Sequence, residues 1–144
     1  MFSNEYLRNA TWYYNSCIGS AEHSYDSYEI CIVCGDNPYY TFEIINGEAT
    51  ITDVDESISG DIVIPSTICG YPVTSIGGCA FYYCTNLESI EIPNSVTSIG
   101  DWAARECISL ESIEIPKSVA YIGSFAFSGC TSLESIIISS SVTS

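Results

Sequence analysis

Four residues near the amino terminus have the types and the spacing of a tetrahedral metal site. Cys17, His23, Cys31 and Cys34 follow the pattern C-x5-H-x7-C-x2-C. Thiolate sulfur and imidazole nitrogen are the ligands of structural zinc, and four protein ligands leave no open position for a substrate. A bound zinc ion would order a segment that is too small to form a core of its own. The predicted chemistry is therefore structural rather than catalytic.

The zinc prediction depends on one clear motif. The string CIVCG, residues 31–35, has the two-residue gap and the trailing glycine of a zinc knuckle, but no second C-x-x-C pair matches it upstream. The alternative is that these cysteines are reduced or disulfide-linked, in which case the chain needs no cofactor. Both interpretations stay open from the sequence alone.

Sequence motifs of catalysis are absent. The single histidine, His23, lies in the Tyr-rich segment 1–40, which does not predict the rigid pairing of base and nucleophile that a hydrolase needs. The sequence also lacks the patterns G-x-x-x-x-G-K, H-E-x-x-H and G-x-G-x-x-G. We therefore predict that the chain is not an enzyme.

The charge of the chain excludes one class of partner. Eighteen acidic residues against three basic ones give a net charge of −15, which would repel a phosphate backbone. We expect no nucleic acid partner, whereas a basic protein stays open. No apolar run is long enough to span a membrane. The opening MFSNEYLRNATWYYNSC lacks the apolar block of a secretory signal peptide.

The elements that position any binding residue come from an internal repeat. Residues 73–95, 96–118 and 119–141 share the consensus VTSIGxxAFxxCxxLxSIxIPxS, and a fourth copy begins at Val142. A single copy on its own buries too little apolar surface to offset the ordering of its backbone. Stacked copies bury their apolar faces against one another, so the repeat predicts a solenoid with a parallel sheet along one side.

Alternation within each copy separates an inner face from an outer one. Ile90, Ile113 and Ile136 should point into the core. The predicted outer face is concave and binds a protein partner; its residues are Ser89, Glu91, Ser112, Glu114, Ser135 and Ile137. A second acidic column consists of Glu88, Glu111 and Glu134. The alternative is a solvated surface with no ligand.

Other positions of the repeat predict the remainder of each coil. Gly77, Gly100 and Gly123 mark turns, and the stretch Ala103–Cys107 is long enough for one helical turn on the convex side. Cysteines recur at the interval of the repeat, which predicts a column of buried free thiols that pack as small apolar groups. The members of this column are Cys84, Cys107 and Cys130.

The two ends of the array are predicted to differ. Residues 1–40 form a separate Tyr- and Cys-rich segment, and residues 41–72 form an N-terminal β cap with a hairpin at Asn46-Gly47. The final strand of this cap is Ile62–Pro65, and the string STICGYP after it is expected to bulge as a loop. No cap pattern follows the last copy. Either the chain continues beyond residue 144, or its open end self-associates.

The strings GDIVIPSTICGYPVTSIGGCAF and CTNLESIEIPNSVTSIG closely resemble the BspA-like class of leucine-rich repeats. The resemblance covers about residues 41–144 and implies a strand on the concave side with irregular or short helical structure on the convex side. It also implies a role in protein binding or adhesion, in a surface or secreted protein. Ala104 departs from the pattern, because Phe81 and Phe127 occupy this position in the other copies, and we expect Trp102 to fill the space.

The predicted fold class is thus a leucine-rich-repeat solenoid, mainly β, with a parallel sheet on its concave face. The predicted function is that of a non-enzymatic protein-binding or adhesion module. Two alternatives remain from the sequence. One is a structural fragment of a longer solenoid without a specific ligand, and the other is a zinc-stabilised regulatory module.

Overall fold

The computed structural model of the chain describes residues 40–68 and 70–144. Ten strands and no helix occur in these residues. Accordingly, they contain no helix that is long and apolar enough to span a membrane.

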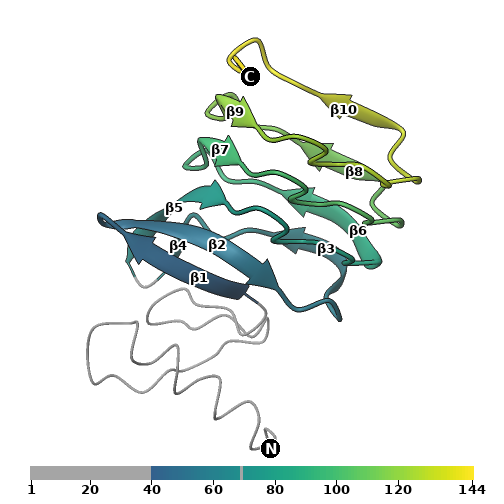
Figure 1. The fold of residues 1–144 in the computed structure, drawn as a ribbon, viewed down its shortest axis with the longest axis horizontal. Coiled ribbons are helices and arrows are strands. Elements are labelled where there is room, and N and C mark those ends of the chain that lie inside the picture. The colour runs from purple at the N-terminus through teal and green to yellow at the C-terminus, as the bar shows by residue number, and fades with distance from the viewer. Residues whose placement is uncertain (1–39, 69) are drawn as a thin grey trace, which may run out of the picture.

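The strands of the described residues form two sheets that run side by side along a solenoid (Figure 1). One sheet has the order β1-β2-β5-β7-β9, with β4 paired to β5, and the other has the order β10-β8-β6-β3. The bounds are β1 Tyr40–Ile45, β2 Glu48–Val54, β3 Ser59–Val63, β4 Thr67–Ile68, β5 Tyr71–Ile76, β6 Asn86–Glu91, β7 Ser98–Ile99, β8 Ser112–Glu114, β9 Tyr121–Ile122 and β10 Ser135–Ile137.

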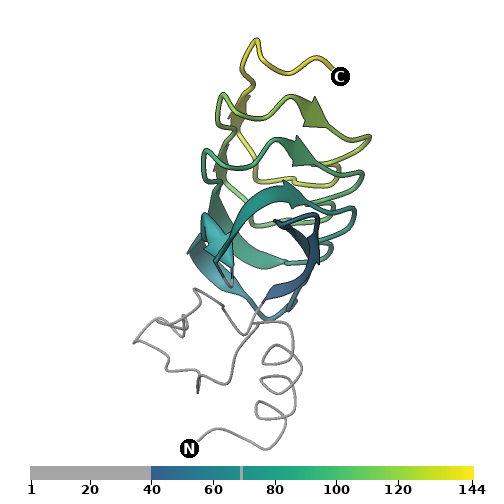
Figure 2. The ribbon, with the colours of Figure 1, turned by 90° about the vertical axis from the view of Figure 1, so that its left-hand side faces the viewer.

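Each repeat forms one coil, which supplies one strand to each sheet. The chain passes from β5 to β6, then from β7 to β8, and then from β9 to β10 (Figure 1). Neighbouring strands pair in parallel at the interval of the repeat, so that Ile113 lies between Ile90 and Ile136. The view in Figure 2 shows the coils stacked along one axis. The solenoid and its parallel sheets, predicted from the period, are confirmed.

The segment before the repeats supplies a further coil. Strand β2 pairs in parallel with β5, and β3 pairs in parallel with β6. Strand β1 runs antiparallel to β2 and covers the edge of that sheet. The predicted hairpin at Asn46-Gly47 is confirmed, because the φ angles of 53° and 80° place both residues in the left-handed region that a tight two-residue turn requires.

The described residues of the string STICGYP, where a bulging loop was expected, include an antiparallel strand pair. Thr67 pairs with Pro72, and Ile68 pairs with Tyr71, in the antiparallel contact of β4 with β5. Ile68 is buried, and its side chain helps to explain why these residues pack against the coil. Strand pairing therefore holds Thr67, Ile68, Tyr71 and Pro72 within this longer coil.

The apolar core lies between the two sheets. Ile90 and Ile113 are 3% and 7% exposed, whereas Glu91 and Glu114 next to them face solvent, as the alternating pattern predicts. Ile136 on β10 is half-buried, because no further strand of the described residues packs over it.

The segment between the two strands of each coil is an irregular turn. We call residues 79–83, 102–106 and 125–129 the long turns. Ala103–Cys107 forms no helical turn, because alternate N–H groups of the first two long turns donate to the next coil rather than within their own coil. Cys79, Phe81 and Tyr83 donate to carbonyl groups of the next coil at 3.0, 2.6 and 3.1 Å. The intervening N–H groups bond within their own coil. The irregular alternative for the convex segment is therefore the correct one.

Adjacent coils approach most closely at a column of glycines. The Gly100 N–H group donates to the Ile76 carbonyl at 2.8 Å. A Cβ atom built on Gly100 would lie 2.5 Å from the backbone nitrogen of Gly78, which is closer than real Cβ atoms approach a neighbour. Gly123, one coil further on, faces the same restriction against Asp101. The glycines predicted at turns are thus required by the close stacking of coils.

Candidate functional site

The outer face of the β3–β6–β8–β10 sheet carries two columns of side chains, one row per coil. We call this surface the serine–glutamate face. The first column is Asp61, Ser89, Ser112 and Ser135, and the second is Val63, Glu91, Glu114 and Ile137. All six residues predicted for the binding face lie in these columns, in the register that the interval of the repeat predicts.

The serine–glutamate face is open to solvent. Ser89 is half-buried because its hydroxyl group donates to the Asp61 carboxylate at 2.6 Å, and the other predicted residues are exposed. The ends of the second column are aliphatic, with Val63 at 63% and Ile137 at 78% exposure. The surface therefore combines a polar centre with apolar contacts at both ends.

The carboxylates of this face repel one another. Glu91 and Glu114 occupy the same position on adjacent strands, and unit charges at a strand spacing of roughly 4.8 Å repel by about 0.9 kcal/mol in water. Glu88 lies within β6, and Glu111 and Glu134 directly precede β8 and β10. The Glu111 N–H group donates to the Glu88 carbonyl at 2.8 Å. A positively charged group on a partner would relieve this repulsion.

Asp61 and Val63 belong to the face but were not predicted as part of it. The sequence does contain a signal for them, because IVIP in residues 62–65 matches the strand pattern I-x-I-P of residues 90–93 and 113–116. The prediction placed this segment in a cap rather than in a coil, although β3 pairs in register with β6. The pattern I-x-I-P alone would have extended the two columns by one row.

The predicted zinc ligands Cys17, His23, Cys31 and Cys34 lie outside the described residues, so the zinc site stays a prediction. Within residues 40–68 and 70–144, no group of three or more histidine, cysteine, aspartate or glutamate side chains is placed to hold a metal ion.

Cys84, Cys107 and Cys130 are free thiols at one position of the repeat, but the predicted burial holds only for the first two, because Cys130 on the last coil is half-buried. Cys84 and Cys107 are fully buried, and the Cys107 thiol donates to the Phe81 carbonyl at 3.0 Å. Burial raises the pKa of Cys84 to about 12. A hydrogen bond with Cys130, together with burial, raises the pKa of Cys107. Both thiols stay protonated at neutral pH, so they pack as small apolar groups and are poor nucleophiles.

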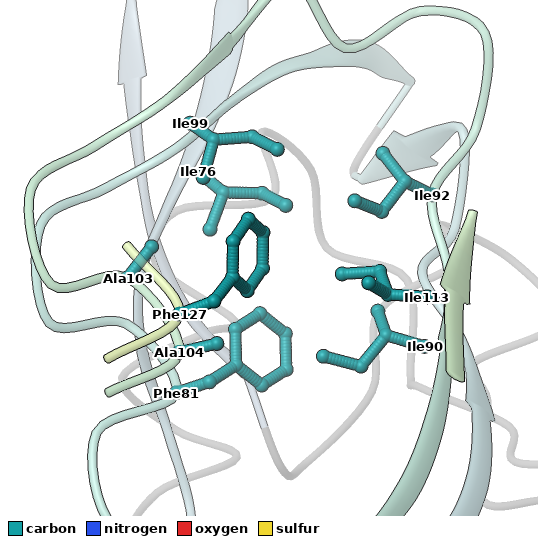
Figure 3. A pocket seen from close by; sticks show the side chains of 9 residues that line it. All are labelled: Ile76, Phe81, Ile90, Ile92, Ile99, Ala103, Ala104, Ile113 and Phe127. Carbon is teal, nitrogen blue, oxygen red and sulfur yellow. The ribbon is translucent and has the colours of Figure 1, made fainter. Parts of the chain in front are cut away.

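The departure at Ala104 leaves a small apolar cavity in the core. Its volume is about 10 Å³, close to the smallest space that holds one water molecule. Figure 3 shows the rings of Phe81 and Phe127 pointing into this space from the coils on either side of Ala104. The prediction that Trp102 fills it is wrong. Trp102 has a φ angle of 54° and is 43% exposed, because the left-handed backbone turns its side chain outward.

Comparison with known proteins matches the whole repeat array, and part of the coil before it, to one family. The profile of the BspA type leucine rich repeat region, with six copies, matches residues 59–144. Among curated proteins no sequence matches the chain.

Solved structures of bacterial repeat proteins share this fold. A leucine-rich repeat protein of T. pallidum is 31% identical over 72% of this chain and 49% of its own, with a TM-score of 0.68. One from Bacteroides ovatus is 31% identical over 72% of this chain and 29% of its own, with a TM-score of 0.63. A leucine rich cell surface protein from Faecalibacterium prausnitzii is 29% identical over 83% of this chain and 31% of its own, with a TM-score of 0.59. This chain thus spans less than half the length of each of these three.

Proposed function

We propose, from the premise that this chain belongs to the BspA-type leucine-rich repeat family, that it is a non-enzymatic module that binds another protein. The observation that carries the proposal is the serine–glutamate face, on which three coils repeat an outward serine in register and two of them repeat the glutamate beside it. A repeated flat surface offers many weak contacts at fixed spacing, which suits recognition of an extended protein surface better than chemistry on a small molecule.

A cell-surface location is the second part of the proposal. It is supported by the similarity to the Faecalibacterium prausnitzii protein, which is named a leucine rich cell surface protein. The measurement is labelling of intact cells of the native source with a membrane-impermeant reagent that modifies lysine. Labelled protein from intact cells supports the location, and labelling only after lysis contradicts it.

Site-specific photo-crosslinking tests the binding face. A photoreactive amino acid replaces Ser112, at the centre of the serine–glutamate face, or Glu43, an exposed control position on β1. We expect adducts with surface proteins from position 112 that untagged protein competes away, and none from position 43. A charge reversal at Glu91 and Glu114 should remove these adducts. Equal adducts from both positions would refute the assignment of the face.

Self-association is a second candidate, favoured by the apolar surface on the last coil. Ile138 is 52% exposed, and Leu133 and Ile136 are only half-buried, although their counterparts in the earlier coils are buried. A second copy that packed against this coil would bury the same side chains that stacked coils bury in the interior. Light scattering over a range of concentrations tests this role. A mass that rises with concentration, and falls in Ile136→Asp, supports it, whereas a constant monomer mass contradicts it.

A further inference from the structure

The long turns place a second exposed surface on the solenoid. Figure 3 shows that Phe81 and Phe127, from two long turns, point inward toward Ile90 and Ile113 of β6 and β8. Other residues of the same turns point outward on the opposite side of the backbone. We call them the long-turn face. Coil by coil, these residues are Cys79, Tyr82 and Tyr83; Trp102, Arg105 and Glu106; and Phe125, Ser128 and Gly129.

Aromatic rings dominate the long-turn face. Tyr82, Tyr83, Trp102 and Phe125 are 37%, 47%, 43% and 69% exposed. The rings of Tyr82 and Tyr83 meet edge to face at 4.6 Å. Trp102 and Phe125 hold the same position on adjacent coils, which are joined here by the hydrogen bond from Trp102 N–H to Ser124 O at 2.9 Å. Single exposed apolar side chains are ordinary, but a group of rings on adjoining coils marks an interaction surface.

The backbone conformation at three of these aromatic residues is unfavourable for residues other than glycine. Tyr83, Trp102 and Phe125 have φ angles of 60°, 54° and 56°, in the left-handed region that favours glycine. The last coil uses Gly129, with a φ angle of 80°, at the position of Tyr83. A glycine would therefore suit the fold better at each of these positions. Cys79 and Glu106 adopt the same φ region at the equivalent positions, so the fold tolerates a side chain there but does not require a ring. The exposed rings contribute little to the core and are accessible to another molecule.

The negative net charge of the chain favours a positively charged partner. The described residues include thirteen acidic side chains and only two basic ones, Arg105 and Lys117. On the long-turn face Arg105 is already matched by Glu106, whose carboxylate lies 3.7 Å from its guanidinium nitrogen. Asp101, next to Trp102, adds a negative charge at the edge of the face. Aromatic rings attract cations at their faces, and the negative field of the protein draws cations toward it.

We propose that the long-turn face binds a basic, arginine-containing segment of a protein partner, whose guanidinium groups stack on the rings of Trp102 and Phe125. This inference rests on the proposed protein-binding function and adds to it a second face and the chemistry of the partner. Arginine suits the site because its planar group combines stacking on a ring with hydrogen bonds to carboxylates.

The test separates ring stacking from general electrostatic attraction. The probe is a short fluorescein-labelled arginine–glycine peptide, measured by fluorescence anisotropy against the full chain. The double variant Trp102→Gly with Phe125→Gly keeps the charge of the protein, and we expect it to bind about tenfold more weakly. Its melting temperature should stay the same or rise, because glycine suits the left-handed backbone. The control variant, Glu91→Gln with Glu114→Gln, removes two charges from the other face and should weaken binding less than about threefold.

Each other outcome overturns the proposal. Equal affinity of the ring variant, or a larger loss in the control variant, would show that only the net charge attracts the peptide. A lower melting temperature of the ring variant would show that the rings stabilise the fold. Absence of peptide binding by the unaltered chain, with crosslinked adducts at Ser112 intact, would refute the basic partner alone. Absence of both would refute the proposed function as well.

Discussion

Replacing Gly100 with alanine should force two coils apart. The added Cβ atom would lie 2.5 Å from the Gly78 nitrogen and 2.8 Å from the Gly77 carbonyl carbon, and both are backbone atoms that cannot rotate away. Ordinary contacts of a Cβ atom begin near 3.4 Å. The coils must therefore separate locally by about 0.9 Å, more than close-packed interiors accommodate without strain.

The separation would break hydrogen bonds between the coils. The bond from Gly100 N–H to Ile76 O, now 2.8 Å, would lengthen to about 3.7 Å, which is beyond hydrogen-bonding distance. The nearby bond from Cys79 N–H to Asp101 O starts at 3.0 Å and would be lost as well. Cys79 and Asp101 are exposed and Gly100 is half-buried, so water can partly replace the lost partners. At roughly 0.5 to 1.5 kcal/mol for each of the two hydrogen bonds, the variant should lose about 2 kcal/mol of stability. This is a large part of the stability of a typical small domain.

Urea unfolding followed by circular dichroism measures this loss, with Gly78→Ala as the matched control. A Cβ atom on Gly78 comes no closer to a neighbour than 3.3 Å, from the Asp101 carbonyl oxygen. Alanine also restricts the unfolded chain, so the control should stay within about 1 kcal/mol of the unaltered protein. Equal unfolding midpoints for the two variants, or a Gly100→Ala midpoint like that of the unaltered chain, would refute the close-stacking argument.

Three further predictions concern the core, the thiol column and the amino-terminal segment. Ile113→Asp places an unpaired charge at a 7% exposed site and should cost about 3 to 5 kcal/mol in urea unfolding, whereas exposed Glu114→Lys should change stability by less than about 0.5 kcal/mol. The pKa of the Cys84 thiol is raised from 9.0 to about 12 on folding. Its contribution to the free energy of unfolding is therefore complete below pH 9. That contribution falls by about 1.4 kcal/mol per pH unit as the pH rises from about 9 toward 12. Cys84→Ala should flatten that part of the pH profile. Protein purified without a chelator should contain about one zinc ion per chain if the predicted site forms, and elemental analysis that finds less than about 0.2 would exclude it.

The interval of the repeat allowed much of the fold to be predicted. It places Ile113 between its counterparts, and alternation along the strand then assigns Ser112 and Glu114 to the outside. These assignments depend only on chain geometry, because strand side chains alternate and equivalent positions stack. For the same reason the predicted residues of the serine–glutamate face lie together in the structure. Whether a partner binds these residues depends on a second molecule, which the interval of the repeat cannot predict.

The conformation of the long turns could not be predicted from residue types. Left-handed φ angles are expected at glycine or asparagine, yet Trp102 and Phe125 adopt them because the hydrogen bonds between coils impose the same path on each copy. The predicted orientation of Trp102 was wrong for this reason. The coil formed by β2 and β3 was missed because its letters match the consensus only in residues 62–65. Pairing with the next coil, rather than sequence identity, therefore determines its path.

The backbone hydrogen bonds that join the long turns of adjacent coils all run from one coil to the next, which affects how the length of such an array can change. Cys79 and Phe81 donate toward the coil that follows them, and Trp102 and Ala104 do the same one coil later. An inserted copy of the whole repeat would accept hydrogen bonds from the coil before it and donate hydrogen bonds to the coil after it. Loss or gain of a whole unit keeps both sheets and the turn ladder in phase, whereas a shorter insertion would disrupt all three together. Gene duplication in multiples of this unit is thus the route by which the array can lengthen without redesign of its interior.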